Sequence, residues 1–381
     1  MKQAIMALDG GGSKLRMLIV DRETREQLYF RQINSGTNLS TVPDKKQALN
    51  NIKGLIIDGH LHIPRDYVLT GIGLSSAGTE IPENKQALKE ALEEVIDTLK
   101  ISSDRINDNP PKLFVTNDID ILLAEADIAI VGGTGTVAAT KYKDIRPYDN
   151  TDEIPEGYVV KRFDGAGPFI GDKGSGYWLG KEILTKVQEI ENLGGFINGK
   201  GEFIEENNSY LRELVLERLF EENGISEDVA RRAIDTSLAH AGAPEFVSLV
   251  YGVTKENGYD FDRAKVAKFA PLADRAASQG DTAANEILKQ AAVELGKNIV
   301  VAYESGGFRD KEHCDILLSG SVAVHSEILG YFLETALKER YRNISIRRNQ
   351  KEPVVSTIEY VINELDSEKT LPKPQDRETG R

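Results

Sequence analysis

The chain contains two copies of one short pattern, in which an apolar run, a glycine-rich turn and a second apolar run follow one another. The first copy covers residues 4–21, with Asp9-Gly10-Gly11-Gly12-Ser13 between its two runs. The second copy begins at residues 128–131 and turns through Gly132-Gly133-Thr134-Gly135-Thr136 into residues 137–140. Apolar runs on both sides of a glycine turn are typical of paired strands. The repetition therefore predicts a duplicated architecture, with two halves that each begin with a glycine-turned hairpin and a central cleft between them.

The length of the chain agrees with two domains. Hydrophobic cores stop growing near roughly 250 to 300 residues, and this chain has 381. We expect an N-terminal domain over residues 1–120 and a C-terminal domain over residues 121–365, which includes a helical insertion. Residues 366–381 hold two prolines and many charges, which predicts a flexible tail.

Strand-like and helix-like segments alternate in the first half. The apolar patterns predict strands over residues 29–33, 67–74 and 112–116, and helices over residues 45–57, 85–99 and 121–126. This alternation is typical of an α/β domain, in which ligands bind at the carboxyl ends of the strands.

Composition and charge exclude several classes of partner. The hydrophobic fraction of 40% and the charged fraction of 28% are those of an ordinary globular protein, and no apolar run is long enough to span a bilayer. A formal net charge of −14 disfavours nucleic acid, because it would repel the phosphate backbone. The N-terminal residues lack the apolar stretch of a secretory signal, and Cys314 is the only cysteine. We expect a cytoplasmic protein without a membrane or nucleic-acid partner.

The first glycine loop has the composition of a phosphate site. Its backbone amides and the Ser13 hydroxyl can surround an anion, and Asp9 at the end of the preceding strand can hold a hydrated magnesium ion. A tight hairpin turn with a solvated aspartate explains the same residues. The second loop favours the phosphate interpretation, because two hydroxyl-bearing loops at the starts of successive halves can hold a polyphosphate from both sides.

Two other nucleotide motifs fail. The segment Gly194-Gly195-Phe196-Ile197-Asn198-Gly199-Lys200-Gly201 has glycine where a P-loop needs the serine or threonine that binds magnesium, and it predicts an exposed turn. In the first loop, Leu15 stands where a dinucleotide fingerprint needs its third glycine.

Asp118 is the candidate general base. It follows the strand predicted over residues 112–116, so its carboxylate would lie at the carboxyl end and could accept a proton from a hydroxyl that attacks the γ-phosphorus of ATP. The alternative is that Asn117-Asp118 serves only as the N-cap of the next helix.

Two later segments have the small residues that a binding loop needs. Glycines recur around Asp172 and Ser175 between residues 164 and 180, just before a predicted helix. A buried-strand pattern at residues 314–318 ends in Ser319-Gly320-Ser321-Val322, where a flat adenine ring could lie against the backbone. A long turn and a simple strand-to-helix turn are the alternatives.

In their order along the chain, these segments resemble the N-acetylglucosamine kinase family and its relatives, the BadF/BadG-type ATPases. Asp9 to Ser13 resembles the first phosphate loop, Gly36-Thr37-Asn38 the sugar-binding loop and Thr116-Asn117-Asp118 the catalytic segment. Gly133-Thr134-Gly135-Thr136 is similar to the second phosphate loop, and residues 171–178 provide the most specific match. Three positions depart from the family pattern: Ser13 stands where threonine is usual, Lys173 where glutamate is usual, and Ser321 where a second glycine is usual.

The resemblance implies two RNase H-like domains of the actin-like ATPase fold that close on ATP, Mg²⁺ and an amino sugar, often in a homodimer. It implies Asp118 as the catalytic base and Asp9 as the metal-binding residue. The implied sugar-binding residues are Asn38, Ser76, Asn117, Asp118 and Asp172. The implied nucleotide-binding residues are Gly11, Gly12, Ser13, Lys14, Thr134, Gly135, Thr136, Gly320 and Ser321. The expected activity is therefore ATP-dependent phosphorylation of a hydroxyl on an amino sugar similar to N-acetylglucosamine.

Two other functions are alternatives to a sugar kinase. The related activators of radical dehydratases share an iron–sulfur cluster between two subunits, but a homodimer with only Cys314 in each chain supplies two thiolates where such a cluster needs four. An ATPase or nucleotide-dependent regulatory protein without sugar phosphorylation is the other alternative, and the changes at Lys173 and Ser321 motivate it.

Overall fold

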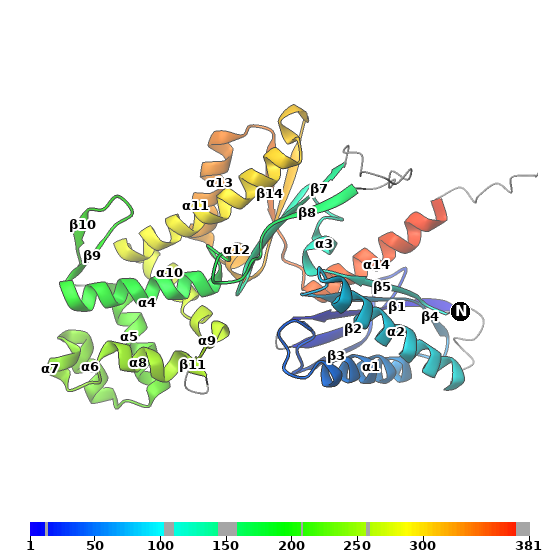
Figure 1. Cartoon of the computed structure of the whole chain (residues 1–381), viewed down its shortest axis with the longest axis horizontal. Coiled ribbons are helices and arrows are strands. Elements are labelled where there is room, and N and C mark those ends of the chain that lie inside the picture. Colours follow the sequence, from blue (N-terminus) through cyan, green and yellow to red (C-terminus); the bar gives the residue numbers. More distant parts are fainter. Residues whose placement is uncertain (12–13, 103–109, 144–157, 207–208, 257–259, 371–381) are drawn as a thin grey trace, which may run out of the picture. The chain divides into compact units, whose positions relative to one another are not determined.

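The chain folds into two α/β units. The computed structural model describes residues 1–11, 14–102, 110–143, 158–206, 209–256 and 260–370 (Figure 1). The first unit contains Met1–Glu125 and the C-terminal segment from Lys351 onward, and the second unit contains Ala126–Gln350. The predicted α/β class is confirmed.

The first unit is built on a five-stranded sheet in the order β3-β2-β1-β4-β5. Its strands are β1 (Lys2–Gly10), β2 (Leu15–Asp21), β3 (Gln27–Ile33), β4 (Tyr67–Ser76) and β5 (Lys112–Thr116). Its helices are α1 (Lys45–His62), α2 (Pro82–Ser102), α3 (Asp118–Leu122) and α14 (Pro353–Thr370). β1, β2 and β3 pair antiparallel, whereas β1, β4 and β5 are parallel.

Residues 4–8 of β1 are all apolar because both faces of the sheet are covered there. Ala4, Met6 and Leu8 pack in the core with residues of α1 and α2. Ile5 and Ala7, which alternate with them and point to the opposite face, pack against α14. The uninterrupted apolar run therefore indicates a strand buried on both sides.

The second unit repeats this sheet in the order β14-β13-β6-β7-β8. Its strands are β6 (Ile128–Gly132), β7 (Thr136–Lys143), β8 (Tyr158–Asp164), β13 (Cys314–Ser319) and β14 (Ile344–Arg348). β6, β7 and β8 pair antiparallel, while β6, β13 and β14 are parallel. Strand order and direction match the first sheet, so the predicted duplication is confirmed.

Helices make up most of the rest of the second unit. They are α4 (Gly176–Leu193), α5 (Tyr210–Asn223), α6 (Glu227–Asp235), α7 (Leu238–Ala241), α8 (Phe246–Thr254), α9 (Arg263–Ala267), α10 (Ala270–Ala277), α11 (Thr282–Ser305), α12 (Ser321–His325) and α13 (Glu327–Arg340), with a 3₁₀ turn at Phe308–Asp310. Two small hairpins interrupt them, β9 (Gly195–Ile197) with β10 (Phe203–Glu205) and β11 (Lys255–Glu256) with β12 (Asp260–Phe261). The segment at residues 194–201, which almost matches a P-loop, contains β9 and part of the turn of the first hairpin. Phe196 of β9 is fully buried, so the expected exposed turn is found only at residues 199–202. In this turn, the Asn198 side chain accepts hydrogen bonds from the backbone N–H groups of Lys200 and Glu202.

The structure differs from the expected domain boundaries at the C-terminus. Residues 351–365 were expected in the second domain, but α14 packs on β1 and β4 of the first sheet. Val354, Ile358 and Val361 are buried there. The helix also continues to Thr370, beyond the expected start of the tail at residue 366, and Asp366 pairs with Arg22 of the first unit. The sequence pattern of α14 does not reveal which of two similar sheets it covers.

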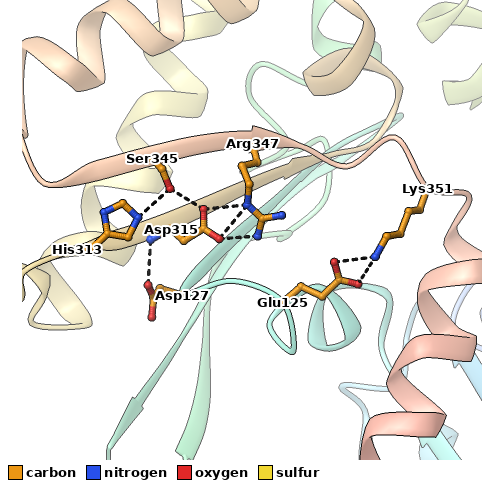
Figure 2. Close-up of polar contacts among 7 residues, drawn as sticks. All are labelled: Glu125, Asp127, His313, Asp315, Ser345, Arg347 and Lys351. Carbon is orange, nitrogen blue, oxygen red and sulfur yellow. Dashed lines mark hydrogen bonds and ion pairs between the residues drawn. The ribbon is translucent and has the colours of Figure 1, made fainter.

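Polar contacts join segments that are distant in the sequence (Figure 2). Lys351 Nζ donates to both carboxylate oxygens of Glu125 at 2.9 and 3.0 Å, which links the two ends of the first unit where the chain leaves it and returns to it. In the second unit, Asp315 accepts hydrogen bonds from Ser345 and Arg347 of β14.

None of the helices in the described ranges is both long and apolar enough to cross a membrane.

The packing of α14 can be tested with Ile358, which is buried against the first sheet. We expect Ile358→Ala to lower the free energy of unfolding by about 2–5 kcal/mol, because it leaves a cavity in the core. Urea denaturation followed by circular dichroism measures the change. Asn363→Ala is the matched control, since Asn363 lies on the same helix but is exposed, and it should change stability by less than about 0.5 kcal/mol. Equal effects of the two substitutions would contradict the assignment of α14 to the first unit.

Candidate functional site

Three parallel strands of the first unit end beside one another. Asp9 of β1 pairs with Ser75 of β4, and Ser75 pairs with Thr116 of β5. These three residues therefore form one row across the carboxyl edge of the sheet. α3 begins two residues after Thr116, at Asp118, so Asp9 and Asp118 belong to the same edge.

The two carboxylates are close enough to interact. Burial and the negative charge of Asp118 raise the pKa of Asp9 to about 6, with a smaller contribution from Glu352, while Arg16 acts in the opposite direction. The Ser75 hydroxyl beside Asp9 is buried and has no hydrogen-bond partner within the described part of the chain. A partly buried carboxylate with an acidic neighbour and an unsatisfied buried hydroxyl is a site that a bound cation stabilises.

Asp118 is not the N-cap of α3. Asn117 takes that role, since its side-chain oxygen accepts the Ile119 N–H at 3.1 Å, and its amide group donates to Glu80 at 3.0 Å. Asp118 is the first residue of the helix and is partly exposed. The cap interpretation therefore accounts for Asn117 and does not account for the carboxylate of Asp118.

Hydrogen bonds tie the loop at residues 34–40 to the first hairpin and to the end of β4. The Thr37 N–H donates to Gly11 O at 2.9 Å, and the Thr37 and Ser76 hydroxyls are 2.8 Å apart. A side chain at Gly10 would overlap Thr37, so this glycine permits the close approach. The next residue, Asn38, is held by the Ser40 N–H, which donates to its side-chain oxygen at 3.0 Å.

The first unit therefore brings together many of the residues predicted from the sequence. Asp9, Gly11, Asn38, Ser76, Asn117 and Asp118 lie at its carboxyl edge or in the loops bonded to it. Lys14 follows the turn, and its carbonyl accepts the Gly11 N–H. Gly12 and Ser13 lie outside the described residues.

The second unit assembles the remaining predicted loops. Gly133 O accepts the Gly176 N–H at 2.7 Å, and Thr134 O accepts the Tyr177 N–H at 3.2 Å, so the hairpin between β6 and β7 is bonded to the start of α4. Gly320 has φ +85° and lies against Gly132, where an added Cβ would come within 2.6 Å of the Gly132 backbone. Only glycine fits this contact, which sets the start of α12 at Ser321 beside the hairpin.

Asp172 has a structural role that the sequence does not indicate. Its Oδ1 accepts the Thr136 N–H at 2.9 Å, and its Oδ2 accepts a 2.5 Å bond from Arg263. Only 4% of the residue is exposed. The Asp172 N–H in turn donates to Asp164 at 2.9 Å. Asp172 therefore supports the second hairpin, and its role as a sugar ligand stays a prediction.

Sequence reasoning missed Ser75, Asp164 and Arg263. Ser75 lies near the end of β4, and only the strand register shows that it is beside Asp9. A loop separates Asp164 from Asp172, and Arg263 lies 91 residues after Asp172. A signal existed for Asp164 alone, since it precedes a glycine at the start of the glycine-rich segment.

Cys314 is a core residue of β13. Its side chain is fully buried, and burial, with the nearby charge of Asp127, raises the pKa of its thiol to about 12. A thiol held protonated in this way is a poor metal ligand, which argues against the iron–sulfur alternative.

Comparisons with known proteins give one matching family and relatives that are named as N-acetylglucosamine kinases. A family model described as the BadF/BadG/BcrA/BcrD ATPase family matches residues 154–358. The N-acetylmuramic acid/N-acetylglucosamine kinase of Clostridium acetobutylicum is 23% identical over 317 residues, which cover 81% of this chain and 82% of that one. The N-acetyl-D-glucosamine kinase of Dictyostelium discoideum is 22% identical over 378 residues, which cover 95% and 98% of the two chains.

A solved structure shares the fold. It is that of a candidate N-acetylglucosamine kinase from Chromobacterium violaceum, which superposes with a TM-score of 0.55 at 17% sequence identity and covers 94% of this chain and 98% of its own. At this level of identity, the likeness bears on the fold, and it agrees with the two repeated sheets.

The raised pKa of Asp9 predicts a gain of stability on its neutralisation. The folded, ligand-free protein keeps the Asp9 proton up to about pH 6, whereas the unfolded chain loses it near the ordinary value of 3.8. Wild-type stability therefore falls as the pH rises between these values. Above about pH 7, we expect Asp9→Asn to raise the free energy of unfolding by on the order of 3 kcal/mol.

Urea denaturation at about pH 7.5 and about pH 5 measures this gain, which should shrink at the lower pH. Asp97→Asn is the control, because Asp97 is an exposed residue of α2 that pairs with Lys100. A loss of stability in Asp9→Asn that is equal at both pH values would contradict the unfavourable charge at Asp9.

Proposed function

Because the chain belongs to the BadF/BadG/BcrA/BcrD ATPase family, we propose that it is an ATP-dependent carbohydrate kinase that phosphorylates a hydroxyl of an amino sugar. Relatives that align with most of the chain are N-acetylglucosamine kinases. The structural observation that carries the proposal is the interaction of Asp9 with Asp118 at the carboxyl edge of the first sheet. Kinases need two such groups, one for a metal ion and one for the hydroxyl of the acceptor.

Asp118 is the proposed general base. A carboxylate at the start of α3 can accept the proton of the sugar hydroxyl while its oxygen attacks the γ-phosphorus and the bond to the ADP leaving group breaks. Asn117 fixes the start of the helix and thereby the position of the carboxylate. Asn38, Ser76 and Asn117 are proposed to bind the other sugar hydroxyls, and Asp172 remains a further candidate ligand.

Asp9 is the proposed ligand of Mg²⁺. Among the described residues, no group of three or more histidine, cysteine, aspartate or glutamate side chains could hold a metal. This fits Mg²⁺ in kinases, where one or two carboxylates act together with water and substrate phosphates. The raised pKa of Asp9 agrees with a site that a cation would complete. When bound, the ion offsets negative charge on the β- and γ-phosphate oxygens.

The glycine loops are the proposed nucleotide site. Gly11, Gly12, Ser13 and Lys14 would contribute from the first unit, and Thr134, Gly135, Thr136, Gly320 and Ser321 from the second. In the second unit, the bonds that join the Gly133–Thr134 turn to the start of α4 hold the loop in one shape before ATP arrives. A homodimer is also proposed by resemblance, and light scattering after gel filtration tests it.

A panel of sugars tests the proposed activity. We expect N-acetylglucosamine or N-acetylmuramic acid to stimulate ADP release in a coupled assay with ATP and Mg²⁺, and plain hexoses to be poorer acceptors. The names of the relatives do not favour a regulatory protein. If no sugar stimulates ADP release, even at the limit of its solubility, the kinase proposal is rejected in favour of a regulatory protein.

Replacement of the proposed base separates catalysis from folding. We expect Asp118→Asn to lower kcat by about 10²- to 10⁴-fold, the range that general base catalysis supplies, with the circular dichroism spectrum unchanged. Asp120→Asn is the matched control, because Asp120 lies on the same helix and is also partly exposed. It should keep turnover within about twofold of the wild type. Near-normal turnover in Asp118→Asn would remove Asp118 from the role.

A further inference from the structure

Arg263, to which no role has yet been assigned, contacts Asp172, the residue that supports the second glycine hairpin. Its guanidinium donates to Asp172 Oδ2 at 2.5 Å, while Asp172 Oδ1 accepts the Thr136 N–H at 2.9 Å. One carboxylate therefore joins an arginine of α9 to the backbone at the start of β7. The pair is unequal in exposure, with 41% of the Arg263 side chain and 6% of the Asp172 side chain exposed.

Several contacts hold Arg263 in place. Asp262 caps α9, since its side chain accepts the N–H groups of Ala264 and Lys265. α9 packs against α4, and any side chain at Gly180 of α4 would overlap the Val266 carbonyl of α9. The guanidinium also lies over the Tyr177 ring, 5.7 Å from its centre. Gly180 thus lets α9 come close enough for Arg263 to reach Asp172.

This arrangement has a conformational and a desolvation cost. Asp164 and Asp172 adopt φ values of +66° and +58°, a region that costs residues other than glycine of order 1–3 kcal/mol each. Arg263 Nε is buried with no hydrogen-bond partner in the described part of the chain. Such costs persist where the surrounding contacts require one geometry, and they concentrate at functional sites.

The charge of Asp172 is the reason that an arginine is needed here. A buried carboxylate directly behind Thr136 would repel phosphates bound by the hairpin. Arg263 neutralises it through a charge-assisted hydrogen bond. Lys173, which follows Asp172 in the chain, is exposed, and the cation in contact with Asp172 is Arg263.

We propose that Arg263 is a positioning residue for nucleotide binding, which holds Asp172 in place, fixes the Thr136 end of the second hairpin through it, and cancels its charge beside the phosphates. The positioning role concerns the ligand-free protein. The charge role rests on the proposed function, since it requires ATP to bind at this hairpin.

Hydrogen–deuterium exchange of the ligand-free full chain tests the positioning. In Arg263→Gln, the peptide that contains Thr136 should exchange about tenfold faster than in the wild type, because its N–H loses a fixed acceptor. Arg275→Gln is the matched control, since Arg275 of α10 is an exposed arginine that also lies over a tyrosine ring, Tyr210, at 5.8 Å. Unchanged exchange in Arg263→Gln, or an equal rise in both variants, would overturn the positioning role whether or not nucleotide binds.

Calorimetric titration with Mg²⁺-ADP tests the charge. We expect Arg263→Gln to weaken binding about tenfold and Arg263→Lys to lie between it and the wild type. The double variant Arg263→Gln/Asp172→Asn should recover most of the lost affinity, because it removes the charge that Arg263 cancels. Such rescue is not expected of a residue that only packs. Affinity within about twofold of the wild type in Arg263→Gln, or a double variant as weak as the single one, would overturn the charge role.

The titration also separates this inference from the proposed kinase activity. Nucleotide binding that depends on Arg263, in a protein whose ADP release no sugar stimulates, would reject the kinase and keep the role of Arg263. If sugar stimulates turnover and the ADP affinity of Arg263→Gln is unchanged, the kinase proposal stands and the charge role of Arg263 is rejected.

Discussion

The parallel pairing of β1 with β4 and of β4 with β5 is the constraint on which the first half of the candidate site depends. It places Asp9, Ser75 and Thr116 in one row and brings Asp118 to the same edge. Because side chains alternate along a strand, a shift of one residue in this register would turn Asp9 to the other face and bury Ile5 and Ala7 against the wrong helices. The apolar packing on both faces therefore also fixes the position of the acidic pair.

In the second unit, close backbone contacts hold the candidate loops in place. Gly320 lies against Gly132, and the hairpin between β6 and β7 is bonded to the start of α4. Asp172 completes the arrangement by accepting the Thr136 N–H, and Arg263 holds Asp172. A loop held by so many bonds loses little conformational entropy when a ligand binds. Rigid support of this kind agrees with the proposed nucleotide site at this hairpin.

Local patterns predicted much of the fold and of the first half of the site. The glycine hairpins, the strand at residues 112–116 and the duplicated order of elements follow from apolar runs and turn residues, and the structure contains them. The prediction that residues 351–365 belong to the second domain was wrong, because the apolar pattern of an amphipathic helix does not indicate which sheet the helix covers. The supporting contact of Asp172 was missed, because its partner Arg263 lies 91 residues away.

By itself, the sequence determined the α/β class, the duplication and the residue types at the ends of the strands, since these depend on interactions between near neighbours in the chain. It also determined that Asp9 lies near the end of one strand and that Asp118 follows the end of another. Only the tertiary structure decided that these strands are in register, that burial and the charge of Asp118 raise the pKa of Asp9, and that Asp172 is paired with Arg263. These properties arise from groups that meet only after the chain has folded, and the spacing of residues along the chain does not contain them.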